Sequence, residues 1–176
     1  MLSKSVIRLA PALALLSVLG MSNVAFANNQ AKLNLAKKAV LAGEVSPYAT
    51  PSLKKALQQA DAISSRMAKT VKYQYHGCEF AEHFYLGWGN DSSEADIKRT
   101  WKASVTKSGM VRATFNNIGS ANLVEFDMVC KGNSCQISDV RSGYSDNPKV
   151  FPKRTSGMSL KQEAQLMISK NSCSWE

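Results

Sequence analysis

Four cysteines constrain the fold of this chain more than any other sequence feature, because a disulfide restricts all the backbone between its two ends. They are Cys78, Cys130, Cys135 and Cys173. An even number of cysteines in an exported chain of this size indicates a disulfide framework. Four cysteines allow three connectivities, so crossed pairing stays open. We favour Cys130–Cys135, which would clip a hairpin, together with Cys78–Cys173, which would tie the chain after the second helix to the C-terminus.

The N-terminal sequence indicates that the chain is exported. Residues 1–27 have a basic start, an apolar stretch shorter than a membrane span and a small-x-small sequence, Ala-Phe-Ala, at their end. We therefore expect a signal peptide that is cleaved after Ala27, and a periplasmic or secreted location. The remaining residues, 28–176, have the length of a single domain.

Helical spacing of apolar residues predicts three helices. The first covers 31–43, and the second begins at Thr50 and Pro51, which suit the N-cap and the first helical position. The last covers 159–170 and opens with Ser-x-x-Gln, the spacing of a capping box. Between the expected sheet and this last helix, 145–158 contains prolines and basic residues and is typical of a surface loop.

Alternating apolar and polar residues predict strands in the middle of the chain. The expected strands cover 71–75, 99–106, 110–115, 122–130 and 135–141. Short turn segments separate the last four, as in antiparallel hairpins. The expected fold class is α+β: N-terminal helices packed on a bent antiparallel meander of four to five strands, followed by a C-terminal helix and stapled by disulfides.

The stretch "YHGCEFAEHF" contains both histidines of the chain and one cysteine. His76, Cys78 and His83, with a glutamate between them, are residue types that bind zinc, and a Cys/His pair can also act as a nucleophile. The spacing matches no zinc motif, and a disulfide would remove the Cys78 thiolate that either chemistry needs. We therefore expect no metal, no cofactor and no catalytic residue, and we interpret the stretch as structural.

Aromatic residues concentrate around this stretch, and tyrosine and tryptophan are frequent at the energetic centres of protein interfaces. The candidate interface consists of Tyr73, Tyr75, Phe84, Tyr85 and Trp88.

A second candidate site is a pocket lined by the inward face of the sheet. Its candidate residues are Trp101, Phe115, Phe126 and Asp139. We expect Asp139 to share a strand face with Cys135 and Ile137, at a sheet edge or a bulge.

The charge of the chain bears on its partners. The formal net charge is +9, and it falls to +7 when the two basic residues of the expected signal peptide are removed. Nucleic acid is not an expected partner outside the cytoplasm, whereas acidic proteins and anionic surfaces are. Weak contact with an anionic surface would involve the loop residues Lys149, Lys153 and Arg154.

Two phrases, "SPYATPSLKKAL" and "VEFDMVCKGNSCQISDVRS", resemble small exported bacterial proteins of unknown function that have a nuclear-transport-factor-2-like (cystatin-like) fold. In the second phrase, Ile137, Asp139 and Val140 match the family's closing Trp-x-Ile-x-Asp-Val pattern, and the resemblance covers residues 31–142. It implies a bent sheet that wraps a helix, with a cone-shaped pocket. It implies no catalytic residue.

These observations favour an exported, non-enzymatic binding protein with a protein partner in the cell envelope. The leading hypothesis is an inhibitor or immunity-type protein that blocks a secreted or cell-wall-directed enzyme. One alternative is a small-ligand-binding or enzymatic domain that uses the cone-shaped pocket. Another is an envelope-surface accessory protein. The sequence leaves the oligomeric state and the identity of the partner open.

Overall fold

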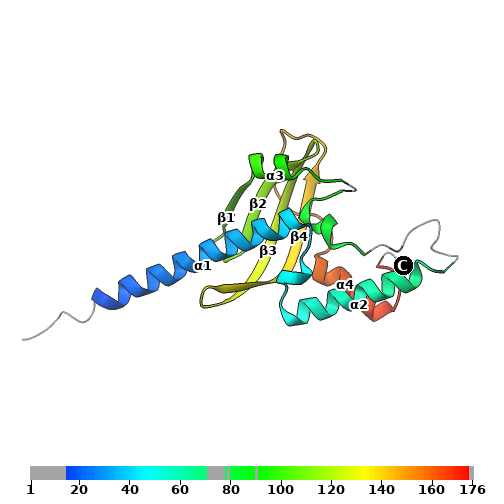
Figure 1. Ribbon diagram of the computed structural model, residues 1–176, viewed down its shortest axis with the longest axis horizontal. Helices are drawn as coiled ribbons and strands as arrows, with labels where there is room; N and C mark the ends of the chain where they lie inside the picture. Colours follow the sequence, from blue (N-terminus) through cyan, green and yellow to red (C-terminus); the bar gives the residue numbers. More distant parts are fainter. Residues whose placement is uncertain (1–14, 71–77, 79, 90, 175–176) are drawn as a thin grey trace, which may run out of the picture.

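One long helix crosses a face of a four-stranded antiparallel sheet, and two shorter helices pack together beside the last strand (Figure 1). The computed structural model describes residues 15–70, 78, 80–89 and 91–174, and side chains from Asn28 onward. The helices are α1 (Leu15–Ala42), α2 (Pro51–Met67), α3 (Glu94–Thr100) and α4 (Leu160–Lys170), with 3-10 turns η1 (Ser46–Tyr48) and η3 (Glu82–Leu86). The strands are β1 (Lys102–Val105), β2 (Val111–Asn117), β3 (Ser120–Lys131) and β4 (Ser134–Ser145).

The strands form a meander in the order β1-β2-β3-β4, so the expected α+β fold class with a C-terminal helix is confirmed. Every neighbouring pair is antiparallel, as the short turns predict. The expected strand over 71–75 lies outside the described residues. The helix that we expected over 31–43 is the C-terminal part of the longer α1, which ends at Ala42.

The core lies between α1 and the inner face of the sheet. On that face Val111 pairs with Phe126, which pairs in turn with Val140, and all three are fully buried. On the helix side, α1 contributes Ala36 and Ala39, whose small side chains allow the helix to lie close to the strands.

Helix ends follow the capping signals in the sequence. The Thr50 hydroxyl accepts a hydrogen bond from the Leu53 N–H (3.4 Å), and α2 begins at Pro51 as expected. In α4 the Ser159 hydroxyl accepts from the Gln162 N–H, and the Gln162 side chain accepts from the Ser159 N–H. This is the predicted capping box, and it confirms where α4 begins.

The strand expected over 99–106 is partly wrong, because its first residues belong to α3. The Ser93 hydroxyl accepts from the Asp96 N–H (3.2 Å) and starts the helix. Within α3, Lys98 pairs with Glu94, four residues earlier (2.5 Å). A cap and an ion pair outweigh the alternation of apolar residues here, and the strand begins only at Lys102.

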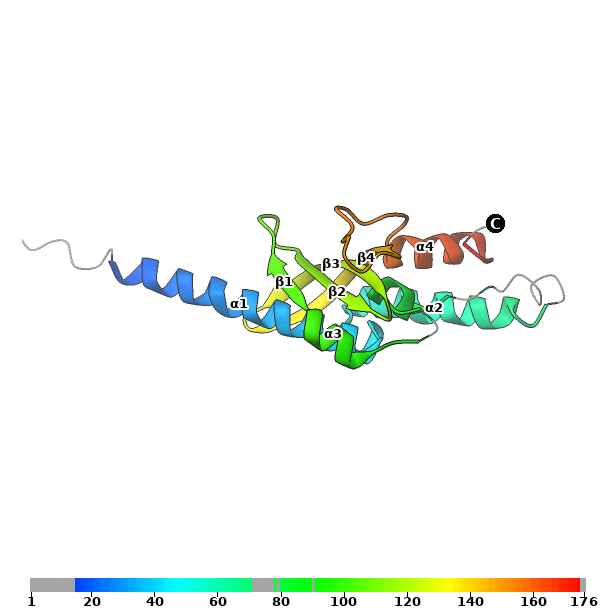
Figure 2. The same ribbon diagram turned by 90° about the horizontal axis from the view of Figure 1, so that it is seen from above.

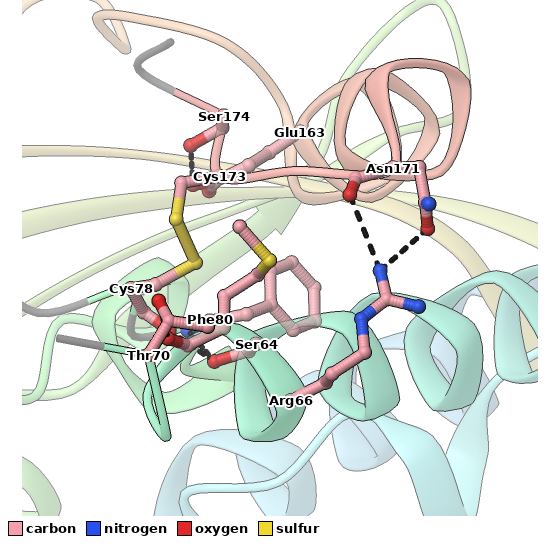
Figure 3. The surroundings of a disulfide bond; sticks show 10 residues. Ser64, Arg66, Thr70, Cys78, Phe80, Glu163, Asn171, Cys173 and Ser174 are labelled. Atoms are coloured by element: carbon pink, nitrogen blue, oxygen red, sulfur yellow. Dashed lines mark hydrogen bonds between the residues drawn. A yellow bond between two sulfur atoms is a disulfide. The ribbon is translucent and has the colours of Figure 1, made fainter. Parts of the chain in front are cut away.

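Both expected disulfides are present, Cys78–Cys173 and Cys130–Cys135. The first joins the chain after α2 to the segment after α4, and both of its cysteines are buried (Figure 3). Around it, the Arg66 guanidinium of α2 donates to the Asn171 side-chain oxygen (2.5 Å), and the Phe80 N–H donates to the Ser64 hydroxyl (3.1 Å). The disulfide is therefore part of a larger contact between α2 and α4.

Residues 146–158, named here the strap, cross the outer face of the sheet, on the side away from α1 (Figure 2). They cover Leu123, which is fully buried although it lies outside the main core. Leu123 pairs with Gly143, where an added Cβ would lie 3.0 Å from the Arg154 carbonyl oxygen. The sheet is thus covered by α1 on one face and by the strap on the other.

Removing the two disulfides separately should have unequal effects on stability. The Cys78–Cys173 bond spans 95 residues, and the chain-entropy model gives about 4.7 kcal/mol for a loop of this length. The Cys130–Cys135 bond spans 5 residues, and the same model gives about 2 kcal/mol. We expect Cys78→Ser/Cys173→Ser to lower the free energy of unfolding more than Cys130→Ser/Cys135→Ser in urea titrations. Equal losses would contradict this account.

Candidate functional site

A cavity of about 560 Å³, named here the aromatic groove, opens at the end of the sheet where β2 turns into β3. Phe84, Trp88, Ile118 and Tyr144 supply its large side chains, and Asn117 and Asn122 supply polar groups. The aromatic residues come from η3 and the segment after it and from β4, whereas Ile118 lies in the turn between β2 and β3. Residues from distant parts of the chain therefore meet at this site.

Trp88 is held in place by the end of α1. Its indole N–H donates to the Val40 carbonyl oxygen (2.9 Å). Gly43, just beyond α1, has a φ of 68°, and an added Cβ there would lie 2.9 Å from the indole ring. A glycine at this position thus both ends the helix and leaves room for the tryptophan.

Asn117 and Asn122 fix the loops around the groove. The Asn117 side chain accepts from the Ser93 N–H (2.8 Å) and donates to the Gly87 carbonyl oxygen (3.0 Å). Gly87 has a φ of 73° and packs so closely on Asn122 that an added Cβ would lie 2.9 Å from its amide carbon. The shape of the groove is set by these contacts within the protein.

Ile118 has an unusual backbone conformation at the rim of the groove. Its φ is 43°, in the left-handed region that β-branched residues rarely adopt, and the next residue, Gly119, has a φ of 80°. Hairpin turns with two positive φ values favour Asn-Gly, because asparagine tolerates this region. An isoleucine held here costs on the order of 1–3 kcal/mol, and such strain concentrates at functional sites.

Three of the large side chains at the groove are exposed to solvent. The exposed fraction is 71% for Tyr144, 52% for Ile118 and 42% for Phe84. Isolated exposed apolar residues are ordinary, but several around one cavity indicate a surface that binds something. The groove is therefore an open site with an apolar rim.

The candidate interface residues divide into three groups in the structure. Phe84 and Trp88 line the groove, and Tyr73 and Tyr75 lie outside the described residues. Tyr85 is half-buried, and its hydroxyl donates to the Glu163 carboxylate in α4. The pKa of Tyr85 is raised mainly by its burial, and the hydrogen bond to the Glu163 carboxylate raises it further. This tyrosine connects η3 to α4.

The structure does not bring the four candidate pocket residues together in one cavity. Phe115 and Phe126 are fully buried and fill the core, and Trp101 stacks on Phe115 with a centroid distance of 5.6 Å. Asp139 pairs with Asp127, whose side chain points to the outer face of the sheet. The inward pocket expected from these four residues is therefore occupied by side chains.

The expectation that Asp139 shares a face with Ile137 is wrong, although the expected bulge is present. The register shifts between Asp127 and Met128, which leaves Ser138 as an extra residue in β4 and reverses the faces of the residues after it. Asp139 is buried there and accepts from the Lys161 N–H at the start of α4 (3.0 Å).

A second cavity, of about 400 Å³, includes Asp127 and Asp139. The guanidinium of Arg141 pairs with both carboxylates, at 2.9 Å and 3.3 Å. The hydrogen bond that Arg141 donates to Asp127 raises the pKa of the guanidinium. Both carboxylates thus have Arg141 as an ion-pair partner, and this pairing explains why Asp127 and Asp139 lie together.

The histidine- and cysteine-containing stretch has structural contacts in its described part. Cys78 is oxidised in a disulfide, and the Glu82 carboxylate accepts from the Val45 and Ser46 N–H groups, both at 2.8 Å. His76 lies outside the described residues, whereas the His83 ring contacts the Phe84 ring at a tilted angle, with 4.3 Å between the centroids. Among the described residues, no group of three or more His, Cys, Asp or Glu side chains is arranged to hold a metal ion.

Sequence reasoning missed Ile118, Tyr144 and both asparagines as members of a site. The available signal was the turn "NNIGS", in which isoleucine occupies a position that favours asparagine.

No family model matches the chain, and neither the curated proteins nor the solved structures contain a match. The two disulfides indicate a non-reducing, exported environment. Within the described part of the chain, no helix combines the length and the apolar composition that crossing a membrane requires.

Replacing Ile118 with asparagine should stabilise the protein. Asparagine relieves the strain of the positive φ, so the free energy of unfolding should rise by about 1 kcal/mol. Urea titrations of the wild type and Ile118→Asn measure the difference. Ile118→Val is the matched control, because it keeps the β-branch and the strain. A stabilisation by valine equal to that by asparagine would contradict the strain.

Replacing Tyr85 with phenylalanine should reduce the loss of stability at alkaline pH. The pKa of Tyr85 is raised above its ordinary value of 10.0, so the folded protein keeps the phenolic proton when the unfolded chain releases it. The free energy of unfolding therefore falls as the pH rises above 10.0, and Tyr85→Phe should show a shallower fall. Urea titrations on both sides of that pH test this, and parallel pH profiles would contradict it.

Proposed function

We propose that this chain is an exported, non-enzymatic binding protein that inhibits a secreted or cell-wall-directed enzyme by seating a projecting segment of it in the aromatic groove. A cleaved signal peptide and a periplasmic location are part of this proposal. So is a nuclear-transport-factor-2-like relationship, with the binding site at the end of the sheet. The exposed rim of Phe84, Ile118 and Tyr144 is the observation that carries the proposal.

The open shape of the groove favours a macromolecular partner. Sites for small ligands bury most of the ligand surface, whereas protein interfaces centre on a few aromatic anchors that become buried only in the complex. The rim residues keep 42–71% of their surface exposed, as such anchors would in the free protein. The internally bonded Asn117 and the packed Gly87 keep the groove rigid, which reduces the entropy lost on binding.

The charge of the protein suits an enzyme with an acidic active site. The formal net charge is +9 for the whole chain and +7 without the two basic residues of the proposed signal peptide. Most glycoside hydrolases, including those that cleave cell-wall glycans, work with a pair of carboxylates at the reacting bond. The net positive charge of the whole protein steers it towards such a cleft.

A small-ligand-binding protein is the second candidate function. The groove volume of about 560 Å³ falls within the usual range for ligand sites, and Asp91 and Tyr144 both line it. A protein that binds only a small ligand would not inhibit any enzyme, and saturating amounts of this protein would leave the target hydrolases active. The inhibition experiment therefore separates the two candidates.

We expect the purified, disulfide-bonded protein to inhibit one member of a panel of peptidoglycan hydrolases at stoichiometric concentration. Tyr144→Ala should weaken this inhibition roughly 30-fold, the effect of losing one interface anchor. Val129→Ala is the matched control, because Val129 is also exposed (59%) but lies in the β3–β4 hairpin, and it should inhibit as the wild type does.

Ile118→Asn supplies a further comparison. It should be more stable than the wild type yet a weaker inhibitor, because the apolar rim is lost. Weaker inhibition by a more stable variant cannot be attributed to unfolding. Inhibition that is insensitive to both Tyr144 and Ile118 would place the binding surface elsewhere, and a panel that stays fully active would refute the proposal.

A further inference from the structure

The strap is held firmly to the sheet beneath it. The Ser156 N–H donates to the Ser142 carbonyl oxygen of β4 (3.0 Å), and the Thr155 hydroxyl donates to the Glu125 carboxylate (3.3 Å). The Arg112 guanidinium donates to the Lys153 carbonyl oxygen. Near its start, the Val150 N–H donates to the Asn147 carbonyl oxygen (3.0 Å). Apart from the Thr155 hydroxyl, these bonds use backbone groups of the strap, and they leave its basic side chains exposed to solvent.

Positive charge collects on the exposed side of the strap. Lys149, Lys153 and Arg154 are exposed, and within the described residues none of the three forms an ion pair. Asp146 is the acidic residue of the strap, so the segment remains net positive. On the sheet below, Lys102 is exposed on the same face, whereas Arg112 is partly neutralised by Glu125 at 3.6 Å.

Apolar side chains lie between these charges. Val150 is 56% exposed and Phe151 is 37% exposed, and Lys149 and Lys153 flank them in the sequence. An aromatic and an aliphatic side chain surrounded by lysine and arginine match the interface of a lipid bilayer, where apolar groups enter the acyl boundary and basic groups meet phosphates. A purely polar polymer would have no use for the two exposed apolar groups.

We propose that the strap docks this protein on an anionic phospholipid surface, with Val150 and Phe151 inserted at the acyl boundary and Lys149, Lys153 and Arg154 against the headgroup phosphates. The contact is peripheral and reversible, because it combines a few charges with two inserted side chains. The strap covers the outer face, opposite α1 (Figure 2), and none of the described strap residues is among those that line the groove. Docking therefore leaves the groove accessible, and it does not depend on the proposed function of the groove.

Vesicle co-sedimentation tests the electrostatic part. The disulfide-bonded protein should bind vesicles rich in phosphatidylglycerol, bind phosphatidylcholine vesicles much less, and dissociate as salt is raised. Lys149→Gln/Lys153→Gln/Arg154→Gln should lower the partition coefficient roughly 100-fold at low salt. Lys54→Gln/Lys55→Gln/Lys69→Gln removes the same charge from exposed positions in and just after α2, and should bind as the wild type does. All proteins share the same N-terminus, so its contribution cancels.

Val150→Ser/Phe151→Ser tests the insertion. It keeps every charge of the strap and should lower the partition coefficient roughly tenfold, because the apolar contact with the bilayer is lost. Thermal unfolding of each variant checks that the fold is intact, as expected for exposed side chains. No binding by the wild type, an equal loss in the α2 control, or an unchanged Val150→Ser/Phe151→Ser variant would each overturn the proposal. Retention on purified peptidoglycan that survives both strap variants, without vesicle binding, would do the same.

Discussion

The contact between α2 and the C-terminal segment, centred on the Cys78–Cys173 disulfide, is the constraint on which the other features depend. It places α4 against α2, and α4 in turn fixes the far end of the strap, whose near end is fixed by β4. The same disulfide fixes the start of the segment that leads into η3, and Tyr85 of η3 is bonded to Glu163 of α4. The wall of the aromatic groove and the strap thus both depend on one buried covalent link.

The residues that form the aromatic groove are held in place by hydrogen bonds to other parts of the chain. The Trp88 indole is hydrogen-bonded to α1, and the Asn117 side chain is hydrogen-bonded to two loops. The walls of the groove are therefore fixed before a partner binds. The strained and exposed Ile118 contributes apolar surface at the expense of stability. A rigid site with an apolar rim suits recognition, because little conformational entropy is lost when a partner binds.

The regular elements of this fold could be predicted from the sequence where local signals were strong. The Thr50 and Ser159 caps place the starts of α2 and α4 correctly, and the symmetric placement of Cys130 and Cys135 around a turn predicts their disulfide. Helix α3 was missed because its cap and ion pair compete with an apolar alternation that continues into β1. The family resemblance stays a prediction.

The sequence by itself determined the secondary structure of the capped helices, the order of the strands, the local Cys130–Cys135 pairing and the basic character of the strap, because each depends on residues close together in the chain or on their number. Only the tertiary structure decided which aromatic residues form a site. Tyr85 and Trp88 are both aromatic members of the expected interface. In the structure Tyr85 is hydrogen-bonded to α4, whereas Trp88 is hydrogen-bonded to α1 and lines the groove. Likewise, the single extra residue Ser138 moves Asp139 to the other face, since strand alternation has a period of two and a bulge reverses it.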